Sequence, residues 1–107
     1  MVFNFYYFCC MTSTDIIQKL KDEMPLLRSR YGVDEIGLFG SYVRNQAIPG
    51  SDVDILVKFS QPSFLKLAGL LNYLENLFKS KVDITTKHSR LSPRFLKRIE
   101  KEIVYAR

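Results

Sequence analysis

Residues 52–58, Asp-Val-Asp-Ile-Leu-Val-Lys, constrain the fold more than any other part of the chain. The segment reads as a β-strand, so Val53, Ile55 and Val57 point to one face of a sheet. Asp52, Asp54 and Leu56 point to the other face. Two carboxylates on one face destabilise a strand through mutual repulsion and desolvation. The sheet is therefore expected to present an acidic edge that a cation compensates.

The segments before this strand predict a helix, a short strand and a turn. Ser13 or Thr14 can cap a helix that ends at Gly32, and Pro25 is expected to kink or break it. Residues 35–39 read as a short buried strand, and residues 41–46 as one helical turn. The apolar positions of the helix recur at spacings of three and four residues: Ile17, Leu20, Met24 and Leu27.

The segments after residue 58 predict two more helices and one more strand. Ser63 can cap a second helix, residues 81–86 form a strand, and Ser92-Pro93 begins a last helix that runs to about residue 104. The expected apolar face of the second helix is Phe64, Leu67, Ala68, Leu71, Leu74 and Phe78. The order predicts a small α/β (α+β) domain with a three- to four-stranded mixed sheet flanked by helices.

The chain has 107 residues, which suits one domain, assigned here to residues 11–107. Residues 1–10 are apolar, carry no charged side chain and lack the features of a signal peptide. We expect them to be a start-site artefact, with translation beginning at Met11, or a disordered tail; the rival interpretation is an extra edge strand or a partner-binding segment. The only cysteines, Cys9 and Cys10, are adjacent, which favours a reducing cytoplasm. No apolar run approaches the ~20 residues of a membrane span.

The positive charge is concentrated near the C-terminus. Residues 79–107 carry nine Lys or Arg and three Asp or Glu, whereas residues 1–78 carry seven and eight. Such an end can be a solvated helix face, or it can bind nucleic acid, an acidic protein or a nucleotide phosphate. The chain lacks zinc-finger spacing and an aromatic RNA-binding pattern, so direct nucleic-acid binding is not expected.

The most informative chemistry lies in Gly40-Ser41, followed after ten residues by Asp52-Val53-Asp54. Two carboxylates at i and i+2 on a strand have Cα atoms ~6.6–7 Å apart, which suits a shared pair of Mg²⁺ ions. Asp83 lies between apolar neighbours on another strand and can supply a third carboxylate. The Gly-Ser turn exposes N–H groups and a hydroxyl to an anion, and Arg44 is placed to reach a phosphate.

The segment GLFGSYVRNQAIPGSDVDILVKF resembles the signature of the DNA polymerase β-type nucleotidyltransferase superfamily. Within it, the sequence is most similar to the minimal nucleotidyltransferases (MNT domains) of prokaryotes. The strand KVDITT resembles the family's third-carboxylate strand, and the likeness covers about residues 13–106. The matching signature residues are Gly40, Ser41, Arg44, Ser51, Asp52 and Asp54.

The resemblance implies the small nucleotidyltransferase fold and a role for each of these residues. Gly40, Ser41, Arg44 and Ser51 would bind ATP. Asp52, Asp54 and Asp83 would be the catalytic and metal-binding residues, with two Mg²⁺ ions as cofactors. Asp83 would also act as general base for an acceptor hydroxyl, which would attack the α-phosphate and release pyrophosphate.

The resemblance also implies a partner. MNT proteins typically pair with a HEPN protein, an RNase toxin, and act as its antitoxin by transferring AMP to a HEPN tyrosine. The chain would then be part of a hetero-oligomer. Two other readings stay open: an antitoxin that neutralises its partner by complex formation alone, and a nucleotidyltransferase acting on a small molecule or RNA. Larger relatives append a domain for the acceptor, and its absence here favours a protein partner.

Overall fold

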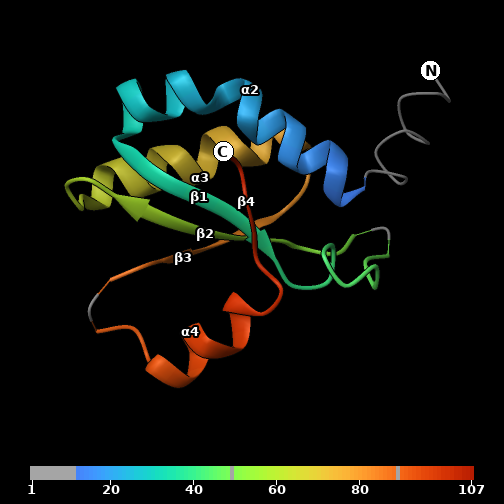
Figure 1. The fold of residues 1–107 in the computed structure, drawn as a ribbon. Helices are drawn as coiled ribbons and strands as arrows, with labels where there is room; N and C mark the ends of the chain where they lie inside the picture. The colour runs from blue at the N-terminus through green and yellow to red at the C-terminus, as the bar shows by residue number, and fades with distance from the viewer. Residues whose placement is uncertain (1–11, 49, 89) are drawn as a thin grey trace, which may run out of the picture.

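A four-stranded mixed sheet with the strand order β3-β2-β1-β4 lies at the centre of the structure (Figure 1). Strand β1 (Val33–Phe39) runs antiparallel to both of its neighbours, β2 (Val53–Phe59) and β4 (Val104–Tyr105). Strand β3 (Val82–Thr86) is parallel to β2. This computed structural model describes residues 12–48, 50–88 and 90–107. The predicted α+β fold with a mixed sheet is confirmed, and the sheet has the larger of the two expected strand numbers.

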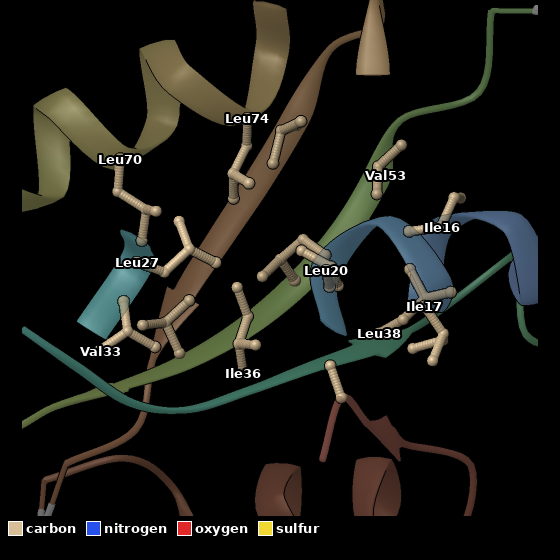
Figure 2. Close-up of a cluster of buried hydrophobic side chains, with 14 of the residues drawn as sticks. Ile16, Ile17, Leu20, Leu27, Val33, Ile36, Leu38, Val53, Leu70 and Leu74 are labelled. Atoms are coloured by element: carbon tan, nitrogen blue, oxygen red, sulfur yellow. The ribbon is translucent and has the colours of Figure 1, made fainter. Parts of the chain in front are cut away.

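Two helices cover one face of the sheet, and a third lies on the other (Figure 1). Helix α2 (Ser13–Tyr31) and helix α3 (Phe64–Phe78) form the first layer, whereas α4 (Pro93–Glu100) lies across from them. Figure 2 shows how α2 and α3 enclose apolar side chains of β1 and β2. Val53, Ile55 and Val57 are completely buried in this core, so the predicted apolar face of β2 is confirmed.

Helix α2 begins and ends on strong capping signals. Thr12 and Asp15 form a capping box, so the N-cap lies one or two residues before the predicted Ser13 or Thr14. Gly32 adopts the left-handed conformation with φ of 68°, which confirms the predicted C-cap. The helix does not break at Pro25. Met24 and Leu27, on either side of the proline, are buried in the core and hold this turn against the sheet.

The buried face of α3 differs from the predicted one. Ala68 is exposed, and Phe64 is 82% exposed because the first turn of the helix lies beyond the core. Leu70, which the sequence analysis did not select, is buried on the same row as Leu74 and Phe78. These three positions are four residues apart, so the helix presents the i, i+4, i+8 row to the core.

The C-terminal helix is shorter than predicted, because α4 ends at Glu100 and the chain then turns into β4. Residues Val104 and Tyr105 pair with Leu38 and Gly37 of β1. Gly37 leaves room for the turn, since a Cβ atom there would lie 2.9 Å from the side chain of Ile103. The β-branched and aromatic residues after 102 favour a strand over a further helical turn.

The described ranges contain no helix that combines the length and the apolar composition required to cross a bilayer. The proposed start at Met11 and the extension of residues 1–10 lie outside the described residues.

The close contact at Gly37 predicts a measurable coupling with Ile103. Gly37→Ala is expected to lower the free energy of unfolding by about 1–3 kcal/mol, because the new methyl group overlaps the Ile103 side chain. In an Ile103→Ala background the same substitution should cost about 1 kcal/mol less, because the overlapping atoms are gone. Urea denaturation of the four proteins measures both costs. Equal costs in the two backgrounds would contradict the contact.

Candidate active site

Two of the predicted catalytic carboxylates lie side by side on the sheet. In the parallel register of β2 and β3, Asp54 is the direct partner of Asp83. Neighbouring strands are about 4.8 Å apart, so both side chains leave the sheet at nearly the same place. Val82 is buried and Ile84 packs against the core, so Asp83 lies on the opposite face, as its alternation predicted.

Asp52 completes the acidic set from the residue just before β2. It lies two positions from Asp54, so its side chain belongs to the same face of the extended chain. This is the face on which α4 lies (Figure 1). The fold therefore brings all three predicted carboxylates to one edge of one face of the sheet.

Asp54 is the electrostatic centre of this group. Partial burial raises the pKa of its carboxyl above the ordinary value, and the negative charges of Asp83 and Asp52 raise it further. Arg44 acts in the opposite direction, and Glu102 adds a smaller upward contribution. The acidic face thus carries more negative charge than its surroundings neutralise, which is the environment that a divalent cation stabilises.

The donor set fits Mg²⁺ in chemistry, because hard cations prefer carboxylate oxygens. In the described part of the chain, however, no three Asp, Glu, His or Cys side chains converge closely enough to hold a metal ion. Like charges repel, so uncompensated carboxylates are expected to diverge. The backbone brings the three residues together, and the side chains must still turn inward to share an ion.

Gly40 packs against Asp54 and so brings the Gly-Ser turn next to the carboxylates of the sheet. Its φ of 85° is left-handed, and a Cβ atom at this position would lie 2.8 Å from Cγ of Asp54. The N–H groups of Val43 and Arg44 donate to the Gly40 carbonyl, and that of Gln46 donates to the Ser41 carbonyl. The predicted turn over residues 41–46 is therefore present, and it lies directly against the Asp54 carboxylate.

Ser51, which was predicted to bind nucleotide, holds the loop that precedes β2. Its hydroxyl accepts a hydrogen bond from the Ile48 N–H at 2.9 Å, and its own N–H donates to the Ile48 carbonyl. The Ser51 carbonyl accepts from the Ser80 hydroxyl at 3.3 Å. These contacts position the loop that delivers Asp52 to the acidic face.

Two residues beside Asp54, Glu102 and Arg98, were not predicted from the sequence as site residues. Glu102 accepts a hydrogen bond from the Gly40 N–H at 2.6 Å and pairs with Arg44 at 3.1 Å. Arg98 and Asp54 line the same cavity. No local pattern signals these roles, because the contact between Gly40 and Glu102 spans 62 positions. The cavity measures about 340 Å³ and is lined by Phe39, Gly40, Arg44, Asp54, Arg98, Ile99 and Glu102.

A slightly larger cavity, about 370 Å³, lies at the far end of β2 beside Phe59 and Phe64. Its lining residues include no carboxylate, and it is remote from the Gly-Ser turn. The predicted site residues Gly40, Arg44 and Asp54 therefore line the other cavity, the one of about 340 Å³.

Comparison with known proteins extends the likeness over nearly the whole chain. A family model described as nucleotidyltransferase domain matches residues 17–106. A protein of Thermococcus cleftensis, named protein adenylyltransferase MntA, is 51% identical over 96 residues, which cover 89% of this chain and 96% of the relative.

Solved structures share the fold. One of a proposed minimal nucleotidyltransferase aligns with a TM-score of 0.72 and 29% identity, covering 89% of this chain and 96% of the other. Another holds a tri-AMPylated HEPN toxin of Shewanella oneidensis in complex with an MNT antitoxin. It aligns with a TM-score of 0.60 and 20% identity over 85% of this chain and 71% of that chain, a level that shows the fold alone.

The contact between Gly40 and Asp54 predicts that Gly40→Ala is far more damaging than a matched change at Gly50. Both glycines have positive φ, 85° and 92°, but nothing lies within 4 Å of a Cβ atom at Gly50. Gly50→Ala should cost about 1–2 kcal/mol of backbone strain. Gly40→Ala should cost about 3 kcal/mol or more, because overlap is added to strain. Urea denaturation of both variants checks the difference, and equal costs would contradict it.

The raised pKa of Asp54 predicts a pH-dependent stability difference. The folded protein binds the Asp54 proton more tightly than the unfolded chain does, so ionisation costs stability as pH rises above the ordinary carboxyl pKa. Asp54→Asn should therefore melt higher than the unaltered protein at pH 7 without divalent cations, and the gap should close near pH 3. Thermal melts in EDTA measure the gap. The exposed Asp34→Asn is the control, and a pH-independent gap would count against this electrostatic account.

Proposed function

The chain belongs to the nucleotidyltransferase domain family, and we propose that it transfers AMP from ATP to a tyrosine hydroxyl of a partner HEPN toxin. In this proposal the modification silences the toxin, and the chain acts as its antitoxin. The observation that carries the proposal is the position of Asp54, which lies between the Gly40 turn on one side and Asp83 on the other. In this arrangement a turn that would bind phosphate lies beside carboxylates that would bind the metal.

The relatives support the choice of donor and acceptor. The Thermococcus cleftensis protein, which matches the chain almost end to end, is named for protein adenylyltransferase activity. The Shewanella oneidensis complex pairs an MNT antitoxin with a HEPN toxin that carries AMP groups. A protein acceptor is therefore a better supported proposal than a small molecule or RNA.

Each residue of the site has a separate role in the proposed reaction. Asp52, Asp54 and Asp83 would hold Mg²⁺, which would neutralise charge on the phosphates as the reaction proceeds. Arg44 and the N–H groups of the Gly40 turn would bind phosphate oxygens and hold the α-phosphate in place. Asp83, the exposed strand neighbour of Asp54, would accept the proton of the tyrosine hydroxyl. The tyrosine oxygen then bonds to the α-phosphorus, the bond to the bridging oxygen breaks, and pyrophosphate leaves.

One observation favours a second candidate, neutralisation of the partner by complex formation alone. The three carboxylates do not form a ready-made metal cluster within the described residues. A binding antitoxin would keep the fold and the partner surface without needing the carboxylates to converge. The two functions differ in what Asp54 contributes.

Intact-mass measurement of a HEPN partner, incubated with the chain, ATP and Mg²⁺, tests the proposal. The partner should gain the mass of one or more AMP units, and EDTA should prevent the gain. Asp54→Asn should slow the transfer on the order of 100-fold or more, because the group that stabilises the developing charge is lost. Asp34→Asn removes the same charge from an exposed position of β1 and should leave transfer unchanged.

Growth rescue separates the two candidates. Asp54→Asn should still bind the partner in a pull-down but should fail to protect cells that express the toxin. Full protection by this variant, together with no mass gain on the partner from the unaltered chain, would refute AMP transfer and leave complex formation as the function.

A further inference from the structure

A carboxylate of this chain already lies in the turn that is proposed to bind phosphate. One oxygen of Glu102 accepts from the Gly40 N–H at 2.6 Å, and both oxygens lie 3.1 Å from Nη1 of Arg44. A backbone N–H and a guanidinium are the donors that an oxyanion of phosphate also uses. Glu102 therefore satisfies both groups in the way that a phosphate oxygen would.

The backbone on both sides of Glu102 is anchored, whereas its side chain is held only by Gly40 and Arg44 and borders a cavity. Before it, the buried Ile99 in the last turn of α4 accepts hydrogen bonds from the N–H groups of Glu102 and Ile103. After it, β4 pairs with β1. The Glu102 side chain itself is 21% exposed and borders the cavity beside Asp54. It can therefore leave the turn by rotating its own side-chain bonds while the strand and the helix stay in place.

We propose that Glu102 is an internal competitor for the nucleotide, which a phosphate group must displace from Gly40 and Arg44, and that this residue sets the nucleotide affinity. The inference rests on the proposed function and deepens it. Without nucleotide, Glu102 satisfies the buried Gly40 N–H, which would otherwise be costly to leave unpaired, and pairs with the half-exposed Arg44. A polyphosphate carries more negative charge than one carboxylate, so it gains more from the same donors.

The charges around the Gly40 turn are consistent with competition between Glu102 and a phosphate group. Glu102 and Asp54 line the same cavity, so the negative charge of Glu102 lies at the site where phosphates and carboxylates would have to coexist. Removing that charge should favour an incoming anion. If Glu102 only positioned the turn, its removal would instead loosen Gly40 and Arg44 and weaken nucleotide binding.

Calorimetric titration of the whole chain with ATP and excess Mg²⁺ distinguishes the two roles. Glu102→Ala should lower the dissociation constant on the order of tenfold, because charge-assisted hydrogen bonds no longer have to be broken. Glu102→Gln preserves the size of the side chain and guards against misfolding of the alanine variant. It should tighten binding as well, but less, because its amide oxygen can still accept from Gly40. The exposed Glu100→Gln removes the same charge two residues away and should bind as the unaltered chain does.

Pyrophosphate and adenosine separate the phosphate subsite from the rest of the nucleotide. Pyrophosphate should gain affinity in the two Glu102 variants as ATP does, whereas adenosine, which has no phosphate, should not. Unchanged or weaker ATP binding by both folded Glu102 variants would overturn the competitor role while leaving the proposed transferase function intact. Absence of ATP binding by every variant and by the unaltered chain would overturn both.

Discussion

The packing of Gly40 against the Asp54 side chain is the contact on which the rest of the site depends. It requires a left-handed residue without a Cβ atom at the end of β1, and it requires β2 to enter the sheet in the register that pairs Phe39 with Asp54. Through this contact the antiparallel pairing of β1 and β2 places the Gly40 turn against the acidic face. The parallel pairing of β2 and β3 then adds Asp83 beside Asp54.

The two faces of the sheet have opposite effects on stability. One face is sealed by α2 and α3 and contains the apolar side chains that stabilise the domain (Figure 2). The other face carries the Asp54 carboxylate, whose charge opposes folding, as its raised pKa indicates. The apolar face must offset that cost. The proposed binding of Mg²⁺ and a polyphosphate would require such uncompensated charge, so stability and the proposed activity would make conflicting demands on the same strand.

The capping signals of the helices were predicted well because each depends on residues that are close in sequence. Gly32, Ser63 and Ser92-Pro93 mark the ends of helices in the structure as they did in the sequence. The apolar face of α3 was predicted less well. Periodicity cannot tell where the core ends, so Phe64 and Ala68 were assigned to a face that only the later turns of the helix bury. The end of α4 was misjudged because the strand after it forms only against β1.

The sequence by itself determined which residues are the candidates for the chemistry: Asp52 and Asp54 two positions apart, a glycine before a turn, and a third aspartate on another strand. Alternation and turn composition are local properties, and they are sufficient for that conclusion. Only the tertiary structure decided that Glu102 lies in the Gly40 turn and that Arg98 borders the same cavity. Those contacts arise because β4 returns to the outer edge of β1 and draws the end of α4 over the acidic face. Strand pairing over more than sixty residues leaves no local pattern in the sequence.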